Sequence, residues 1–424
     1  MKVKYLLLFL LAVIIISCNK AEEVEGPSAS VSLIKDCNDP ADGSPSLDDM
    51  STIGLVDLTS SQSEYEVAIA NASPQPTTLA ELQAIINTIN SNSSNQEMPF
   101  GVNLAGAEFA EENMPGILDE QYTYPNAEEL DYYKSKGLTL IRLPFRWERI
   151  QLSFGESLET ENINKIKEVV KMATDREMQV ILDLHNYGRY RLNGSDEIIG
   201  SDQVSIANVK DLWTKLAAEF KGETNIWGYG IMNEPHDMLS NTSWFSIAQE
   251  IINGIRSIDT KTTIIVSGDS WSSAERWKEE SDNLKNLVDP SNKIIYEAHV
   301  YFDANAGGFY GDSYDDESAS PQTGVNRVQP FIDWLKENNL RGYIGEYGIP
   351  DDDARWLTTL DNFLTHIKNN CINGTYWAGG PWWGTDKMAI DPTDDTGESN
   401  PLSGAERPQM SIVEKYTSAN TECD

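Results

Sequence analysis

This sequence has few positive charges, few histidines and few cysteines, and each shortage excludes a class of function. The chain has 32 Lys and Arg residues against 67 Asp and Glu, a formal net charge of −35 over 424 residues. Such a surface repels phosphate backbones and anionic membranes, so we expect no nucleic-acid partner. The four cysteines and four histidines form no zinc motif. No phosphate loop, dinucleotide fingerprint or regular calcium loop appears, so we expect no metal and no cofactor.

No apolar run is long enough to span a bilayer, but a shorter one lies at the N-terminus. Two lysines precede an apolar stretch over residues 6–16, a length typical of a secretory signal. The stretch ends in Ile15-Ile16-Ser17-Cys18, which resembles a bacterial lipobox. We therefore interpret residues 1–17 as a lipoprotein signal peptide and Cys18 as the lipidation site, with a plain cleaved signal as the alternative. The expected location is the cell envelope, lipid-anchored at the outer membrane or on its surface, or secreted, with no other membrane contact.

The three other cysteines are Cys37, Cys371 and Cys423. An odd number cannot pair completely within one chain. A bridge between Cys371 and Cys423 is one option that the sequence leaves open.

The composition changes along the chain and predicts four parts. After the signal, residues 18–60 are rich in Ser, Asp, Pro and Gly and are predicted to be a flexible linker. Residues 61–96 show two short helical patterns, 63–72 and 78–90, separated by prolines. They form a small helical module whose role stays open. The main domain is expected to occupy residues 97–424.

In this domain strand-like segments alternate with helical patterns, which is typical of a (β/α)8 TIM barrel. A doubly wound sheet is the rival, but the glycine-containing run 101–106 does not open a helix with a dinucleotide fingerprint. The predicted strands are 101–104, 138–143, 179–184, 227–232, 263–267, 293–298, 342–345 and 374–377, and the helices include 163–174, 205–220, 244–258, 328–338 and 353–368.

Two glutamates follow apolar strands at points where a carboxylate is of little use for packing. Glu234 follows the strand at 227–232, and Glu346 follows the short apolar run at 341–345. In a barrel, the C-terminal strand ends carry the chemistry. A carboxylate pair without a metal-ligand pattern is the minimum equipment for cleaving a glycosidic bond, one delivering a proton and one facing the sugar ring from below. Double displacement requires their oxygens to lie about 5 Å apart.

Other polar residues follow neighbouring strands and suit the same chemistry. Arg142 and Tyr301 are expected to hold Glu346 ionised as hydrogen-bond donors. Three further side chains are expected to bind the sugar 2-hydroxyl and to orient the ring and the carboxylates: Asn233, His185 and His299.

Several tryptophans also follow the strands and offer flat apolar faces to a pyranose ring. Trp377 ends the eighth strand, and the pair Trp382 and Trp383 follows it. Trp147 and Trp271 follow the second and fifth strands and are candidates for further subsites. Core packing is the alternative for each of these last four.

These motifs resemble glycoside hydrolase family 5 over nearly all of residues 99–390. They are Asn-Glu-Pro at 233–235, His-x-Tyr at 299–301, Gly-Glu-Tyr-Gly at 345–348 and the strand-eight Trp377. The resemblance implies a retaining barrel enzyme with Glu234 as acid/base and Glu346 as nucleophile.

A closer likeness is to the endo-β-1,4-glucanases of that family, carried by the runs 101–106, 184–189, 230–237 and 301–303. It adds Asn186 and Asp303 as substrate contacts. The insertion at 191–197 and the long acidic loop at 307–324 depart from the family pattern and leave the preferred linkage open.

We therefore expect a monomeric, retaining, endo-acting hydrolase of β-1,4-glucan, whose partner is a β-linked polysaccharide or oligosaccharide. Mixed-linkage glucan, xyloglucan and β-mannan are the alternative substrates. A non-catalytic surface glycan-binding lipoprotein is the alternative of another class.

Overall fold

The computed structural model describes residues 65, 81–86, 99–394, 396–397 and 399–417. The chain divides into two units, Met1–Glu97 with Asp424, and Met98–Cys423. In the first unit, residues 81–86 are helical. The predicted signal peptide, the linker and the remainder of the helical module, except Tyr65, lie outside the described residues.

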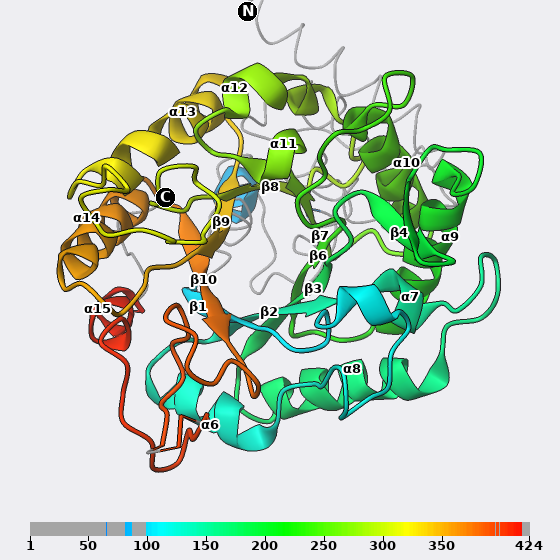
Figure 1. Ribbon diagram of the computed structural model, residues 1–424. Coiled ribbons are helices and arrows are strands. Elements are labelled where there is room, and N and C mark those ends of the chain that lie inside the picture. The colour runs from blue at the N-terminus through cyan, green and yellow to red at the C-terminus, as the bar shows by residue number, and fades with distance from the viewer. Residues whose placement is uncertain (1–64, 66–80, 87–98, 395, 398, 418–424) are drawn as a thin grey trace, which may run out of the picture. The chain divides into compact units, whose positions relative to one another are not determined.

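Eight parallel strands close into a barrel in the second unit (Figure 1). Their order around the barrel is β1-β10-β9-β8-β7-β6-β3-β2, so every strand lies beside the barrel strands that precede and follow it in sequence. This is the connectivity of a (β/α)8 barrel, and the fold prediction is confirmed. The strands are β1 (Gly101–Leu104), β2 (Leu140–Phe145), β3 (Gln179–Leu184), β6 (Ile226–Gly230), β7 (Thr263–Ser267), β8 (Ile294–His299), β9 (Gly342–Tyr347) and β10 (Asn373–Gly379).

Helices between the strands form the outer layer of the barrel (Figure 1). The longer ones are α6 (Ala127–Ser135), α8 (Thr160–Thr174), α9 (Ile206–Phe220), α10 (Trp244–Arg256), α13 (Thr323–Asn338) and α14 (Arg355–Asn369). The shorter ones are α7 (Trp147–Ile150), α11 (Asp269–Ser272), α12 (Trp277–Glu280) and α15 (Met410–Val413), with 3-10 turns η2 (Glu111–Asn113), η3 (Asp282–Asn286) and η4 (Glu414–Tyr416).

Helix α10 shows why these segments are helical. The Ser243 side chain caps its first turn by accepting a hydrogen bond from the Ser246 amide. Ile247, Ile251 and Ile255 then recur every four residues and are fully buried on one face. Each such burial stabilises the fold by about 1.5–3 kcal/mol.

Helix α6 was missed by the sequence analysis because its apolar pattern is short and interrupted by acids. A local signal does exist, since Asn126 and Glu129 form a reciprocal capping box at its start.

An apolar layer fills the N-terminal end of the barrel interior. It is built from one residue on each of six strands: Leu140, Ile181, Trp227, Ile265, Ile295 and Tyr343. Side chains two positions further along a strand point into the same interior. On β2, β3 and β8 these next inward positions are Arg142, Asp183 and Glu297, all fully buried. The barrel is therefore apolar at one end and charged toward the strand ends.

The insertion expected at 191–197 forms a β-hairpin, β4 (Arg189–Leu192) with β5 (Ser195–Ile198). Its two-residue turn is Asn193-Gly194, with φ of 52° and 84°. Both values lie in the left-handed region, which an Asn-Gly pair adopts in hairpin turns.

Cys371 is disulfide-bonded. Because the other three cysteines lie outside the described residues, its pairing with Cys423 stays a prediction. Within the described part of the chain, no helix combines the length and apolar character required to cross a lipid bilayer.

Candidate active site

Glu234 and Glu346 meet at the C-terminal end of the barrel. Glu346 lies in β9, and Glu234 follows β6 with a left-handed backbone, φ 42°. A non-glycine residue in that region costs on the order of 1–3 kcal/mol, and such residues cluster at functional sites. One carboxylate oxygen of each glutamate and one ring nitrogen of His299 all lie within 4.8 Å of one another. This spacing matches the about 5–5.5 Å of retaining glycosidases and is shorter than the separation in inverting ones.

The surroundings of Glu346 consist of hydrogen-bond donors. Arg142 Nη1 donates to its Oε1 at 3.1 Å, and the Tyr301 hydroxyl donates to its Oε2 at 2.8 Å. Burial raises the pKa of Glu346, His299 and Arg142 oppose that rise, and the Glu234 charge adds to it. Because both oxygens accept hydrogen bonds, the geometry favours the ionised carboxylate.

Glu234 is more open than its partner. Its side chain is 17% exposed, against 6% for Glu346. Its Oε1 faces His299 Nδ1 at 2.7 Å. A carboxyl with this access can exchange a proton with a bound molecule or with water.

Arg142 is the centre of the charged layer and is fully buried. Its Nη2 lies 2.6 Å from Asn233 Oδ1, 3.1 Å from an Asp183 oxygen and 3.0 Å from a Glu297 oxygen. Its Nη1 also donates to Asn103 Oδ1 at 2.9 Å. A buried guanidinium needs such partners, because an unpaired charge away from water costs several kcal/mol.

Sequence reasoning missed three residues of this layer: Asn103, Asp183 and Glu297. A signal was present for the two acids. Each lies inside an apolar strand and precedes a histidine by two positions, Asp183 before His185 and Glu297 before His299. Residues two apart on a strand face the same side, so an acid and a histidine are brought together at each place.

Two of the predicted tryptophans stack on histidines that follow the barrel strands. Trp377 stacks on His185 with centroids 5.4 Å apart, and Trp383 meets Trp377 edge-on at 5.9 Å. On the side of β7, Trp271 stacks on His236 at 4.3 Å and is 42% exposed. Trp382 is also 42% exposed.

Three predicted substrate contacts are corrected by the structure. Trp147 is fully buried, and its indole N–H donates to Gln151, so it presents no face to a sugar. Asn186 is also fully buried, where it accepts from the Trp147 amide and donates to Glu148.

Asp303 is the third correction and is 1% exposed. Its carboxylate accepts hydrogen bonds from the backbone amides of Gly308 and Phe309. It shapes the loop after β8, and its burial keeps the carboxylate out of reach of a substrate.

The group Glu234, His299 and Glu346 also has the donor spacing of a metal site. The local charges argue against that use. His299 faces a carboxylate at each ring nitrogen, and the Arg142 guanidinium contacts Glu346. A metal ion would have to displace a proton from the imidazole and lie beside a fixed cation, so the residues fit proton transfer better.

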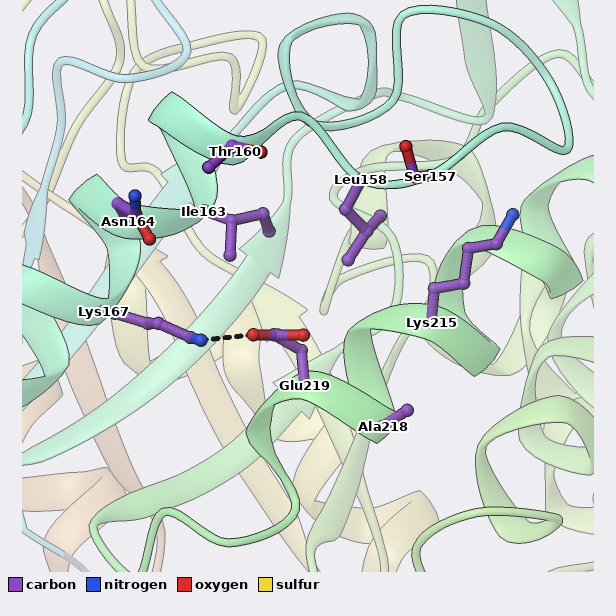
Figure 2. Close-up of a pocket in the computed structure, with 9 residues that line it drawn as sticks. All are labelled: Ser157, Leu158, Thr160, Ile163, Asn164, Lys167, Lys215, Ala218 and Glu219. Atoms are coloured by element: carbon purple, nitrogen blue, oxygen red, sulfur yellow. Dashed lines mark hydrogen bonds and ion pairs between the residues drawn. The ribbon is translucent and has the colours of Figure 1, made fainter.

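A separate cavity of about 440 Å³ lies on the outer helical layer, between the start of α8 and the end of α9 (Figure 2). Leu158, Ile163 and Ala218 form its apolar wall, and Lys167 pairs with Glu219 across it. It contains none of the strand-end residues, so the chemistry is assigned to the barrel mouth.

The comparisons agree with this geometry. The family model described as Cellulase (glycosyl hydrolase family 5) matches residues 99–382. Endo-beta-1,4-glucanase B of Emericella nidulans is 34% identical over 311 residues, which are 72% of this chain and 90% of that protein. The crystal structure of Pseudomonas stutzeri endoglucanase Cel5A in complex with cellobiose is 39% identical, with a TM-score of 0.70, covering 77% of this chain and 94% of that one. XacCel5A in complex with cellopentaose is 34% identical with a TM-score of 0.68, over 76% and 99% of the two chains.

Proposed function

Since this chain belongs to the cellulase family, glycosyl hydrolase family 5, and is an endo-β-1,4-glucanase-type glycosidase, we propose that it hydrolyses internal bonds of β-1,4-glucan with retention of configuration. The observation that carries the mechanism is the approach of a Glu234 oxygen to a Glu346 oxygen within 4.8 Å. That gap leaves no room for a water between carboxylate and sugar, as inversion would need.

In the first step, an ionised Glu346 oxygen attacks the anomeric carbon and forms a glycosyl ester. Glu234 gives its proton to the glycosidic oxygen, so the leaving chain departs as an alcohol. In the second step, Glu234 takes a proton from water, and the hydroxide displaces Glu346 from the anomeric carbon. Both carboxyl groups return to their starting states.

The neighbouring side chains support these steps. Arg142 and Tyr301 hold the two oxygens of Glu346, which aims the nucleophile. Arg142 also holds the carbonyl of Asn233, so the side-chain amide is oriented for the sugar 2-hydroxyl. His185 lies beneath Trp377 and braces the ring on which the reacting sugar rests.

The aromatic rings suggest a direction for the polysaccharide. Trp271 stacks on His236, and His236 Nδ1 contacts the backbone carbonyl of Glu234, the proton donor. The leaving chain must pass the proton donor, so we place Trp271 under the leaving-group side. Trp377, Trp382 and Trp383 then serve the other side.

Replacing Trp271 with alanine should raise KM for cellopentaose about tenfold, since a lost sugar–ring contact is worth about 1.4 kcal/mol. An aryl β-cellobioside has no sugar on the leaving side, so its KM should change little. Val288→Ala, at an exposed position between η3 and β8, is the matched control and should change neither value. An equal rise in KM for both substrates would show that Trp271 does not bind the sugar on the leaving-group side.

A reducing-sugar assay on carboxymethylcellulose tests the function directly. We expect release of reducing ends with a rapid fall in viscosity, because internal cleavage shortens chains faster than it produces sugar. Mixed-linkage glucan, xyloglucan and β-mannan form the comparison panel. Faster cleavage of one of them than of carboxymethylcellulose would make that polysaccharide the assigned substrate. Release from none of them would favour a glycan-binding protein.

We further propose that the protein is exported and anchored through Cys18 as a monomer. The support for the anchor is the lipobox-like Ile15-Ile16-Ser17-Cys18. Metabolic palmitate labelling should mark the wild-type protein and leave Cys18→Ser unlabelled. Label that persists in the variant would exclude Cys18, and size-exclusion chromatography of the enzyme released from its anchor checks the monomer.

A further inference from the structure

Two acid–x–histidine pairs flank Arg142 inside the barrel. Asp183 lies in β3 and His185 directly follows that strand, whereas Glu297 and His299 both lie in β8. In each pair a carboxylate oxygen meets an imidazole nitrogen, at 2.7 Å in the first and 3.2 Å in the second. Both acids also contact Arg142 Nη2. The two pairs have the same spacing in sequence. Their other contacts, however, favour a neutral imidazole in the first pair and a cationic imidazole in the second.

His185 is held neutral. Arg142 can only donate, so it fixes the carbonyl of Asn233 toward itself and leaves the amide N–H to face His185 Nε2 at 3.2 Å. Nε2 must therefore offer a lone pair, while Nδ1–H donates to Asp183. Burial lowers the pKa of His185 to about 3, which agrees with this pattern.

His299 is held as a cation. Its Nδ1 faces Glu234 Oε1 at 2.7 Å, with Glu346 Oε2 at 3.5 Å, and its Nε2 faces Glu297. Nε2–H donates to the Glu297 carboxylate, and Nδ1–H donates to Glu234 Oε1, which accepts even when the other oxygen of Glu234 carries a proton. Burial alone would lower the pKa of His299, but Glu346, Glu234 and Glu297 together raise it to about 10.

We propose that Glu297 is a positioning residue that keeps His299 doubly protonated, so that a fixed cation faces Glu234 and Glu346 and sets both limbs of the pH–activity profile. This inference rests on the proposed function. Glu297 reaches Glu234 through His299, and it reaches Glu346 through His299 and through Arg142.

Charged and polar groups on five other strands or the segments after them surround this pair. Arg142 on β2 and Ser267 on β7 contact Glu297, and Asp183 on β3 shares Arg142 with it. Glu234 after β6 and Glu346 on β9 face His299. Burial alone would raise the pKa of Glu297, but Arg142 and His299 hold it below its ordinary value, so Glu297 stays charged throughout the working range.

The variant Glu297→Gln separates two electrostatic effects of opposite sign. Removing a negative charge lowers the pKa of nearby carboxyl groups and would move both limbs to lower pH. If His299 also loses its proton, Glu234 and Glu346 lose the cation that faces them at 2.7 and 3.5 Å. The pKa of Glu346, which His299 lowers, then rises. We expect both limbs of kcat/KM to move up by about one pH unit.

Asp183→Asn is the matched control, because it removes the acid of the other pair. His185 is already neutral, and burial raises the pKa of Asp183 to about 7, so its charge is partial near neutrality. We expect the limbs to stay in place or to move slightly down. If kcat/KM falls in both variants but neither limb of its pH profile moves, Glu297 has only a structural role.

Imidazole ¹⁵N NMR of the full-length enzyme reads the charge state without any substrate. One imidazole should stay doubly protonated above pH 8 in wild type, and that signal should be lost in Glu297→Gln and retained in Asp183→Asn. A His299 that is neutral at pH 7 in wild type would overturn the inference. Because this readout needs no turnover, it remains informative even if the polysaccharide panel gives no cleavage.

Discussion

Replacing Glu346 with alanine should lower hydrolysis of carboxymethylcellulose by on the order of 10⁴-fold or more, with the fold intact. The variant loses the nucleophile, and no other described carboxylate is held by both Arg142 and Tyr301. Removing a buried acid relieves a burial penalty, so the melting temperature should not fall greatly.

Azide should restore part of the activity of Glu346→Ala on an aryl β-cellobioside. The small anion enters the space left by the carboxylate and attacks the anomeric carbon from that side, which gives a glycosyl azide of inverted configuration. NMR of the product identifies the anomer.

Glu234→Ala is the matched comparison. An activated aryl leaving group needs no proton, so the variant should still form the glycosyl ester on Glu346. Azide entering beside position 234 should then give the retained anomer. If the two variants yield the opposite anomers, the roles of the two glutamates are exchanged.

Gly345→Ala is expected to cost about 3 kcal/mol of stability and about 10²-fold in activity. A Cβ atom at this position would lie 1.8 Å from Glu297 Oε1 and 2.7 Å from its carboxyl carbon. The Glu297 carboxylate cannot retreat, because it is fully buried between Arg142 and His299. Either β9 moves, which displaces Glu346 at the next position, or Glu297 leaves His299.

Gly222→Ala is the control, since an added Cβ there meets nothing within 4 Å. That substitution should be neutral or stabilise by about 0.4–1 kcal/mol through the unfolded chain. Thermal unfolding and kcat/KM on the aryl cellobioside, measured for both variants, check the contrast. Wild-type values for Gly345→Ala would show that Glu297 does not pack against β9 as described.

The barrel was predictable because strand and helix periods are local properties of the chain. The segment at 179–184 is a continuous apolar run and becomes β3 over the same residues. The segment at 138–143 was placed two residues early, because Leu138 is as buried as the strand it precedes. Helix α6 was missed because its apolar positions are few and are interrupted by acidic residues.

The site was predictable where a polar residue interrupts or follows an apolar strand. Glu234, Glu346 and Arg142 were found in this way, and the chain folds so that they converge. Trp147 and Trp271 follow their strands in similar fashion, yet one is fully buried and the other is 42% exposed. Sequence could not separate them, because burial depends on which neighbouring segments cover a loop.

By itself, the sequence determined the barrel, the pair of glutamates and the acidic, cysteine-poor character of the chain, because these follow from local periodicity and composition. Only the tertiary structure decided which groups face His185 and His299, and so the charge states that we infer for them. Asp183-x-His185 and Glu297-x-His299 have the same spacing, but a protonation state depends on what lies beyond the strand: an amide N–H for His185 and carboxylates for His299. Those partners come from other strands and meet only when the barrel closes.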